Sequence, residues 1–141
     1  MGRTREQMIE IAHRHAAAEA NGDLATTMAT LDPSPVYEFQ PAGLLLKGLP
    51  AVRTYYEHFF KTFQPLIAGY DLRSEWVNDE GLGQEYFIRL RKPEGGTETH
   101  AVIGILLFGE NGLSGERLYA SDRMLRSMFG PAWDLAEPIA R

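Results

Sequence analysis

The sequence predicts an α+β fold in which helices pack on one face of a curved sheet. Three observations lead to this class. Apolar residues recur at helical spacing over most of residues 4–65, whereas side chains alternate with a period of two over most of residues 67–121. Turns rich in glycine and proline separate the alternating segments. The chain has 141 residues and neither a repeat nor a linker, so we expect a single domain over residues 1–141.

Three helices are expected in the first half of the chain. The first ends at Asn21-Gly22, a suitable helix stop, and Asp23 can then cap a second, short helix. The segment Asp32-Pro33-Ser34-Pro35 ends that helix, because proline disfavours helical geometry in the residue before it. The third helix opens around Pro50, which the first turn tolerates, and carries a wide aromatic stripe. The expected helices cover residues 4–21, 23–31 and 48–64.

Six strands are expected, because short segments rich in apolar and aromatic residues lie between turn signals. They cover Val36–Phe39, Leu44–Lys47, Ile67–Asn78, Gln84–Arg91, Glu98–Phe108 and Glu116–Ser121, and a short helix follows at Asp122–Phe129. Over residues 101–108 the fifth strand is apolar on both faces. Helices can cover one face, and we expect a second copy of the chain to cover the other, which gives a homodimer through the outer face of the sheet.

Composition and spacing exclude several classes of protein. The chain lacks cysteine, which removes disulfides, thiol nucleophiles and thiolate metal sites, and its net charge of -5 argues against a nucleic-acid partner. Its start is too polar for a signal peptide, and no run reaches the ~18 apolar residues of a membrane span. We therefore expect a cytoplasmic protein with no membrane partner. No histidine pair has metal-site spacing and no glycine-rich loop joins a strand to a helix, so we expect neither metal nor cofactor.

Three segments carry a family resemblance through their order and spacing. They are Gly22-Asp23-Leu24, VYEFQPAGLLLKGLPAVRTYY at residues 36–56 and FGENGLSGERLYASDRMLRSMFG at residues 108–130. Together they resemble the nuclear transport factor 2-like fold, and within it the SnoaL-like polyketide cyclase group, which is related to ketosteroid isomerases and limonene-epoxide hydrolases. The resemblance implies a cone in which a curved antiparallel or mixed sheet and three helices enclose a pocket for a small hydrophobic molecule. It implies no single chemistry, because the fold carries both enzymes and non-catalytic members.

The acids that the resembling enzymes use are missing or displaced in this chain. Where the ketosteroid isomerase pattern has its base and its protonated acid, Gln40 and Gly104 stand. Where the SnoaL-like pattern ends its last strand with an aspartate, Ser121 stands, and Asp122 follows on the opposite face of a regular strand. Asp122 is a candidate acid/base if the strand ends at Ala120, and otherwise it caps the next helix together with Ser121.

Glu38 and His100 are the other candidate catalytic residues. In an apolar pocket, the Glu38 carboxylate would have a raised pKa suited to acid/base work, whereas on a short edge strand it would be solvated or paired with an arginine. His100 can shuttle a proton if its strand phase, shared with Gly104, faces the pocket, but a strand entrance also suits an exposed histidine. Asp71-x-Arg73 matches the spacing of the aspartate–arginine relay of the resembling epoxide hydrolases, although on a different strand.

The expected ligand-binding groups are aromatic residues and one histidine. Buried tyrosine hydroxyls need polar partners or water, so tyrosines suit the wall of a wet pocket. His15 lies on the apolar stripe of the first helix, where it either forms hydrogen bonds in a packed interface or lines the pocket. Phenylalanines on the third helix fit a structural core as well as a pocket wall. The candidate set is His15, Tyr56, Phe60, Trp76, Tyr86 and Tyr119.

Two functions are compatible with these residues. The first is a cofactor-independent acid/base enzyme of the cyclase, isomerase, dehydratase or hydrolase type, which acts on a small hydrophobic oxygenated ring through Asp122 or Glu38, assisted by His100. The second is a non-catalytic module that binds a small hydrophobic ligand in the same pocket. The missing acids favour the binding module, and the retained tyrosines favour the enzyme. A protein-interaction domain would need an exposed apolar groove apart from the dimer face, of which the sequence gives no sign.

Overall fold

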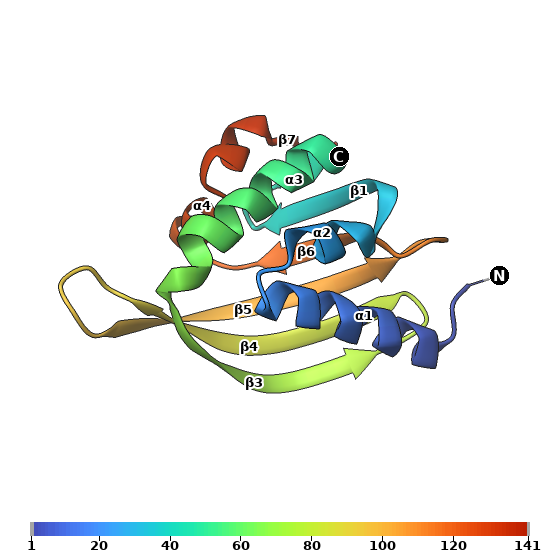
Figure 1. Cartoon of the computed structure of the whole chain (residues 1–141), viewed down its shortest axis with the longest axis horizontal. Helices are drawn as coiled ribbons and strands as arrows, with labels where there is room; N and C mark the ends of the chain where they lie inside the picture. Colours follow the sequence, from blue (N-terminus) through green and yellow to red (C-terminus); the bar gives the residue numbers. More distant parts are fainter. Residues whose placement is uncertain (1, 141) are drawn as a thin grey trace.

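A curved, seven-stranded sheet forms the frame of the molecule (Figure 1). The computed structural model describes residues 2–140. The strand order is β3-β4-β5-β6-β1-β2-β7, in which β1 and β6 pair in parallel and the other neighbours are antiparallel. The strands are β1 (Leu31–Gln40), β2 (Leu44–Lys47), β3 (Ile67–Val77), β4 (Gly81–Arg91), β5 (Thr97–Phe108), β6 (Leu113–Tyr119) and β7 (Glu137–Pro138).

Helical segments lie before, between and after these strands. The α-helices are α1 (Arg5–Ala20), α2 (Leu24–Ala29), α3 (Leu49–His58) and α4 (Asp122–Phe129). Shorter segments are the π-helical η1 (Phe59–Phe63) and the 3-10 helices η2 (Gln64–Leu66) and η3 (Gly130–Leu135). The predicted α+β fold, with helices packed on one face of a curved sheet, is confirmed. Within residues 2–140, no helix combines the length and apolar character needed to cross a membrane.

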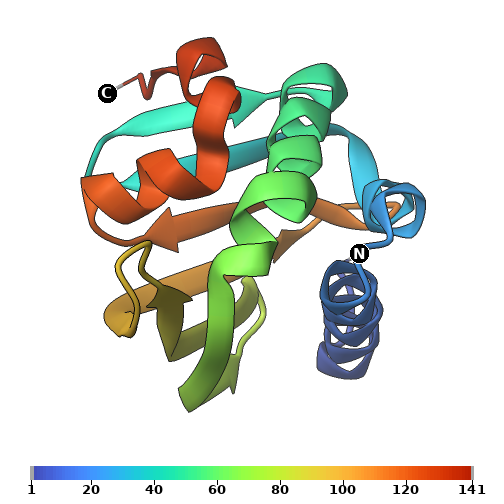
Figure 2. The same ribbon diagram turned by 60° about the vertical axis from the view of Figure 1, so that its left-hand side comes forward.

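The helices divide the concave face of the sheet into two halves (Figures 1 and 2). In one half, α3 and α4 pack together over β1 and β2. The ring of Phe129 in α4 stacks on Phe39 of β1 and on Tyr55 of α3, with centroid distances of 3.9 and 4.3 Å. All three side chains are buried. This half is therefore a solid aromatic core, and α1 alone covers the other half, over β3 and β4.

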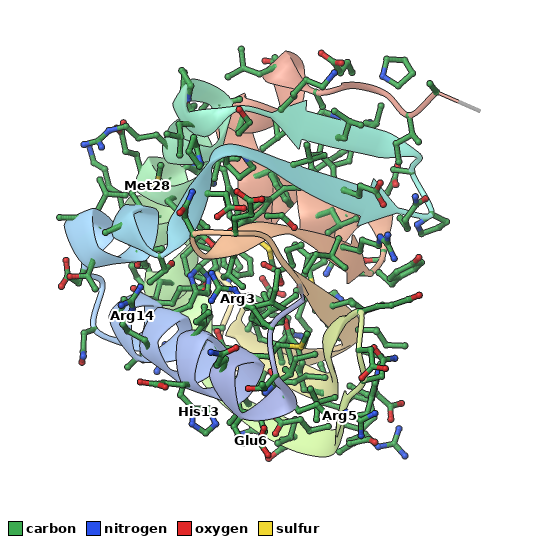
Figure 3. All side chains as sticks on the ribbon, turned by 90° about the vertical axis from the view of Figure 1, so that its right-hand side faces the viewer. Arg3, Arg5, Glu6, His13, Arg14 and Met28 are labelled. Atoms are coloured by element: carbon green, nitrogen blue, oxygen red, sulfur yellow. The ribbon has the colours of Figure 1, made fainter. Side chains whose placement is uncertain are left out.

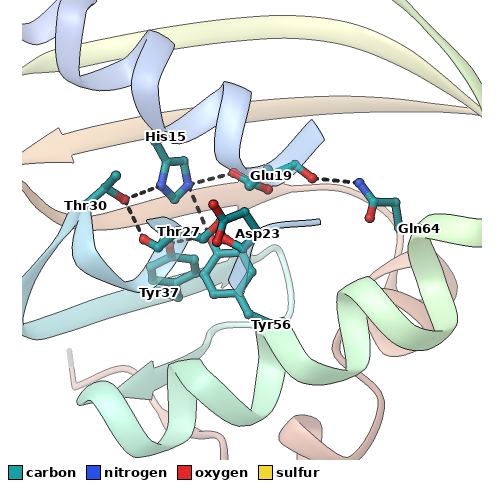
Figure 4. Close-up of polar contacts among 8 residues, drawn as sticks. All are labelled: His15, Glu19, Asp23, Thr27, Thr30, Tyr37, Tyr56 and Gln64. Atoms are coloured by element: carbon teal, nitrogen blue, oxygen red, sulfur yellow. Dashed lines mark hydrogen bonds and ion pairs between the residues drawn. The ribbon is translucent and has the colours of Figure 1, made fainter. Parts of the chain in front are cut away.

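Hydrogen bonds hold the helix α1 at both of its ends. Figure 3 shows Arg3, which precedes its first turn, and Figure 4 shows Glu19 and Gln64 at its last turn. Before its first turn, Arg3 donates from Nε to the carbonyl of Gly109 at 2.8 Å and from Nη2 to that of Glu110 at 2.6 Å, both in the turn between β5 and β6. In its last turn, the Glu19 carbonyl accepts a hydrogen bond of 2.7 Å from the Gln64 side chain. These contacts hold the helix as a cover over the strands β3 to β6.

The strand β1 is longer than the sequence predicted and includes both prolines of the expected helix stop. Leu31 pairs with Leu113 of β6, and the next pair in the ladder joins Val36 and Gly115. The register shift between the two pairs leaves Asp32–Pro35 out of this ladder, where the missing N–H of proline breaks no strand pairing. The second helix consequently ends at Ala29 instead of continuing through residue 31.

Other boundaries also differ from the sequence prediction. The third helix keeps α-helical geometry only to His58 and then continues as a π-helical turn and a 3-10 turn. The strand β4 begins at Gly81, before the predicted start. The last long strand ends at Tyr119, and the Ser121 side chain accepts a 3.2 Å hydrogen bond from the Met124 amide as the N-cap of α4. The segments η3 and β7 were not predicted.

Candidate functional site

A cavity of about 510 Å³ lies between α1 and the strands β3 to β6. Small residues keep this space open, because the inward face of α1 carries Ala12, Ala16 and Ala20 and the opposite strand β5 contributes Gly104. Apolar and aromatic side chains make up much of the remaining wall. The polar side chains of the lining are His13, His15, Glu19, Gln64, Tyr70, Glu75, Gln84, Tyr86 and Glu116.

Glu116 reaches the cavity because side chains alternate along β6. It pairs with Tyr37 of β1 and Leu106 of β5, and all three face the concave side, whereas Arg117 points to the outer face. Gly104 leaves room for the carboxyl group, since a Cβ at that position would lie 3.2 Å from Glu116 Oε1. Among the described residues, no hydrogen bond engages this carboxyl group. A polar acid therefore faces the cavity without a protein partner.

His15 is fully buried at the inner end of the cavity, and its hydrogen bonds determine its tautomer (Figure 4). The Thr30 hydroxyl donates its single proton to the Thr27 carbonyl at 2.6 Å. The same hydroxyl oxygen lies 2.7 Å from His15 Nδ1 and can therefore only accept, so Nδ1 carries a hydrogen. The second ring nitrogen, Nε2, is consequently the atom that gains or loses a proton.

The Nε2 atom joins His15 to an acid and to a pair of tyrosines. It lies 2.6 Å from Glu19 Oε1, one helical turn along α1, and 3.1 Å from the Tyr56 hydroxyl. The Tyr56 hydroxyl lies in turn 2.6 Å from that of Tyr37. Both tyrosines are fully buried. The network fixes His15 beside Glu19, whose side chain is half-buried and lines the cavity.

The surroundings of Glu116 and His15 raise the pKa values of both groups. Burial, reinforced by the negative charge of Glu19, raises the pKa of Glu116 from 4.5 to about 8, although His15 opposes the shift. Burial disfavours the charged form of His15, but the Glu19 carboxylate outweighs this effect and raises the pKa of His15 above 6.5. With a pKa of about 8, Glu116 is protonated at neutral pH, and it faces the same cavity as the His15–Glu19 pair.

These shifts make the stability of the protein depend on pH. Between pH 4.5 and about 8, the folded state keeps a proton on Glu116 that the unfolded chain has released. The free energy of unfolding therefore falls as pH rises through this window, by up to about 1.4 kcal/mol per pH unit. His15 adds to the decrease above pH 6.5, because its folded pKa is also raised. In Glu116→Gln we expect the free energy of unfolding to change much less with pH. The stability of the variant relative to the wild type should therefore be higher at pH 8 than at pH 5.

Urea denaturation at pH 5, 6, 7 and 8 measures this dependence. The matched control is Glu85→Gln, which removes an exposed carboxylate that pairs with Arg73 on the outer face of the sheet and should keep the wild-type slope. Equal slopes for the wild type and Glu116→Gln would contradict a protonated Glu116 in the folded state.

The role of Thr30 in orienting His15 can be tested separately. In Thr30→Val, the Nδ1–H group of His15 loses its acceptor, so we expect the neutral imidazole to populate both tautomers and the protein to lose about 1–3 kcal/mol. The ¹⁵N chemical shifts of His15 above its pKa report the tautomer ratio. Thr27→Val is the control, because it removes another buried hydroxyl, which donates to Asp23, without touching the ring. An unchanged tautomer ratio in Thr30→Val would contradict the assignment.

The three predicted catalytic residues lie outside the cavity, and this expectation needs correction. Asp122 is an exposed residue in the first turn of α4, after the N-cap Ser121, in agreement with its capping alternative. Glu38 faces the outer side of β1 and lies 3.4 Å from Arg117, because Tyr37 and Phe39 take the inner face. His100 has the strand phase of Gly104, as expected, but it lies near the start of β5, away from the cavity, and pairs with Glu98 at 3.1 Å.

The predicted ligand-binding residues divide into three groups. His15 and Tyr86 line the cavity. Tyr56 lies directly behind the wall, hydrogen-bonded to His15, and Phe60 stacks on it with a centroid distance of 5.7 Å. Trp76 and Tyr119 are on the outer face of the sheet, because their strand phase is opposite to that of the cavity residues. Of the six predicted residues, two therefore lie in the cavity wall, two lie behind it and two lie on the outer face of the sheet.

Sequence reasoning missed Glu19 and Glu116 as functional residues, although both left a signal. Glu19 follows His15 by four residues on the apolar stripe of the first helix, the spacing at which two side chains meet. Glu116 alternates with Leu118 and Ala120, and is thus the one charged residue in an otherwise apolar strand phase. In each case a carboxylate interrupts an apolar face, a pattern that marks a buried acid.

Metal binding finds no support in the part of the chain that the structure describes. Within residues 2–140, no three His, Asp or Glu side chains are close enough together to hold a metal ion. The side chains that line the cavity suit hydrogen bonding and proton transfer, because they include carboxyl, imidazole and phenol groups.

Comparisons with known proteins identify the fold. No protein-family model and no curated protein sequence matches the chain. An NTF2-like protein of unknown function from Mesorhizobium loti superimposes with a TM-score of 0.67 at 17% identity, over 86% of this chain and 96% of that one. One from Cytophaga hutchinsonii ATCC 33406 gives 0.65 at 14% identity, over 81% and 99% of the two chains. One from Burkholderia xenovorans LB400 gives 0.62 at 20% identity, over 84% and 86%. The chain has the NTF2-like fold.

Proposed function

We propose that the chain is a cofactor-independent acid/base enzyme that acts on a small, hydrophobic, oxygenated ring compound. The proton-transfer groups in this proposal are Glu116 and the His15–Glu19 pair, in place of Asp122, Glu38 and His100. A SnoaL-like relationship is part of the same proposal, since one of the segments that carry the resemblance, residues 108–130, contains β6 and with it Glu116.

One observation carries the proposal: a carboxyl group that is protonated at neutral pH faces the same cavity as a carboxylate. Burial raises the pKa of Glu116 to about 8, so this group can donate a proton, while Glu19, 2.6 Å from His15 Nε2, is the group that accepts one. A buried acid with a raised pKa that shares a cavity with a second carboxyl group is typical of enzymes that move protons. The apolar walls suit a ligand with few charges.

For a ring ketone, the proposed reaction is an enolisation. Glu116 donates a hydrogen bond to the ketone oxygen, and Glu19 takes a proton from the carbon next to the carbonyl. The electron pair of that C–H bond forms a C=C bond, the π pair of the C=O bond moves to oxygen, and the oxygen takes the proton of Glu116. Return of a proton from Glu19 to the same carbon, with return of the enol O–H proton to Glu116, restores the ketone with its hydrogen exchanged. In a substrate with a second carbonyl, the C=C pair of the enol instead forms a C–C bond to that carbonyl carbon, its π pair moves to its oxygen, which takes a proton from Glu19, and the enol O–H proton returns to Glu116. His15 holds the Glu19 carboxylate in place through Nε2.

The experiment is deuterium exchange into 4-tert-butylcyclohexanone, incubated with the full-length protein in D2O and analysed by mass spectrometry. We expect exchange beside the carbonyl well above the buffer rate, and an unchanged rate in Asp122→Asn, whose carboxylate is exposed on α4. Binding of the ketone with exchange only at the buffer rate would contradict the enzyme and favour the non-catalytic binding module. That alternative rests on the absence of the resembling enzymes' acids from Gln40, Gly104 and Ser121.

A homodimer through the outer face of the sheet is also a proposal. Large apolar side chains remain accessible there, with exposed fractions of 37% for Ile103, 39% for Trp76 and 42% for Tyr119. Burial of this surface against a second copy would remove it from water and would leave the cavity, on the opposite face, open to ligand. We likewise keep the cytoplasm as the proposed location.

A further inference from the structure

We infer that the substrate carries a positively charged amine, which binds at the mouth of the cavity against Glu75 and the rings of Tyr70 and Tyr86. This inference rests on the proposed function and names the substrate class more narrowly. In this arrangement the oxygenated ring enters the inner end, near His15 and Glu116, and the ammonium group remains at the edge strand β3.

Charge is distributed very unequally between the two faces of the sheet. The cavity lining includes the carboxyl groups of Glu19, Glu75 and Glu116, and none of its described residues is a lysine or an arginine. The chain as a whole carries a net charge of -5, which adds to the negative potential. The basic residues of this lining are His13 and His15, and His15 already pairs with Glu19. A carboxylate or phosphate ligand would therefore find no lysine or arginine here, whereas an ammonium group would find the carboxylate of Glu75.

The arginines of β3 and β4 are engaged away from the cavity. Arg73 pairs with Glu85 at 3.6 Å and lies over the Phe87 ring on the outer face. Arg89 forms an ion pair with Asp71 on the same face. Arg91 donates to backbone carbonyls where η2 joins β3. The positive charges nearest to the mouth in these two strands are therefore already paired or turned away from it.

A β-bulge directs Glu75 into the cavity. The ladder between β3 and β4 pairs Leu72 with Tyr86 and then shifts register, so that Glu75 pairs with Gln84 and shares the concave face. With regular alternation, Ser74 would take that face and Glu75 would point outward. The carboxylate accepts a 2.5 Å hydrogen bond at Oε2 from the side-chain amide of Gln84, and within residues 2–140 it forms no ion pair. This neutral donor leaves the negative charge of Glu75 uncompensated.

Two aromatic rings complete the mouth. Tyr70 of β3 and Tyr86 of β4 meet edge to face with a centroid distance of 5.7 Å, and both line the cavity. Tyr70 is 53% exposed and the neighbouring Leu72 is 58% exposed, so apolar surface is open at this edge of the sheet. The face of a tyrosine ring attracts an ammonium group, and alkyl groups on nitrogen gain further contact with apolar surface. The Glu75 carboxylate and the two tyrosine rings together match an alkylated ammonium group better than a neutral group of the same shape.

The test compares two ligands of the same shape by isothermal titration of the full-length protein. They are 4-(trimethylammonio)cyclohexanone, which is permanently cationic, and the neutral 4-tert-butylcyclohexanone. We expect the cation to bind about tenfold more tightly at low salt, and the ratio to fall as salt screens the charges. In Glu75→Gln the ratio should fall to about two or less. Glu85→Gln, which removes the same charge from the outer face, should keep the wild-type ratio.

Several results would overturn the inference. One is binding of the cationic ketone that is no tighter than binding of the neutral ketone. Another is a preference for the cationic ketone that persists in Glu75→Gln. Tighter binding of the anionic 4-oxocyclohexanecarboxylate would do the same. Deuterium exchange separates this inference from the proposed function. If the protein catalyses exchange into the neutral ketone but does not bind the cationic ketone more tightly, the inference of an amine is wrong and the proposed enzyme stands. If it binds the cationic ketone more tightly but catalyses exchange into neither ketone, the protein is an amine-binding module and the proposed enzyme activity is wrong. If neither ketone binds, both proposals fail.

Discussion

Replacing Glu116 with glutamine is expected to slow deuterium exchange into 4-tert-butylcyclohexanone by about 10³-fold, within the range of about 10² to 10⁴ that general acid catalysis contributes. The amide has nearly the same shape and can still donate a hydrogen bond to the ketone oxygen, but it cannot transfer a proton to it. The ketone should therefore bind with similar affinity while the rate of exchange falls. A loss confined to the rate distinguishes proton transfer from a role in binding.

The pH profile gives a second readout of the same variant. Because the pKa of Glu116 is raised to about 8, the wild-type rate should fall as pH rises above this value and the group loses its proton. In Glu116→Gln the residual rate should lack this alkaline decrease. Asp122→Asn serves as the control for loss of a carboxylate outside the cavity. A wild-type rate in Glu116→Gln, or the same alkaline limb in both proteins, would contradict the assignment of Glu116 as the acid.

Truncation of Phe129 to alanine is expected to lower the free energy of unfolding by about 3–5 kcal/mol. The ring is fully buried and stacks on Phe39 and Tyr55, so its removal takes away both apolar burial and ring contacts and leaves a void in the solid half of the core. A domain of this size is typically stable by about 5–15 kcal/mol, so the variant would lose a large part of its stability.

Urea denaturation at pH 6 measures the effect, and a leucine of the hollow half provides the contrast. Leu72 lines the cavity mouth and is 58% exposed, so Leu72→Ala should change the free energy of unfolding by no more than about 0.5 kcal/mol. A loss below about 1 kcal/mol in Phe129→Ala, or equal losses in the two variants, would contradict the division of the concave face into a solid and a hollow half.

Much of the fold followed from local patterns. The apolar spacing of residues 4–21, the turn signals around residues 92–96 and 109–112 and the alternation of β3 to β6 were enough to predict the α+β class and most elements. The errors fall where pairing between distant segments overrides local preference. Asp32–Pro35 reads as a helix stop, but the segment starts a strand because Leu31 pairs with Leu113 across the sheet.

The candidate site was harder to predict, because the facing direction of a strand depends on register. Glu38 and Tyr119 were assigned to the pocket, yet Tyr37 and Leu118 take the inner face of β1 and β6. A shift of one residue exchanges the two faces of a strand, and one chain alone does not reveal which phase meets the helices. The bulge that turns Glu75 inward is likewise visible only in the ladder between β3 and β4.

By itself, the sequence determined the fold class, the order of the elements and the types of group available for catalysis: with no cysteine, these are carboxyl, imidazole and phenol groups. Only the tertiary structure decided which of them meet. Glu116 reaches the cavity because β6 lies between β1 and β5, and His15 and Glu19 face it because α1 is held across the sheet. Local sequence sets the conformation of each segment, whereas the surroundings of an acid, and so its pKa, depend on residues far away in the chain.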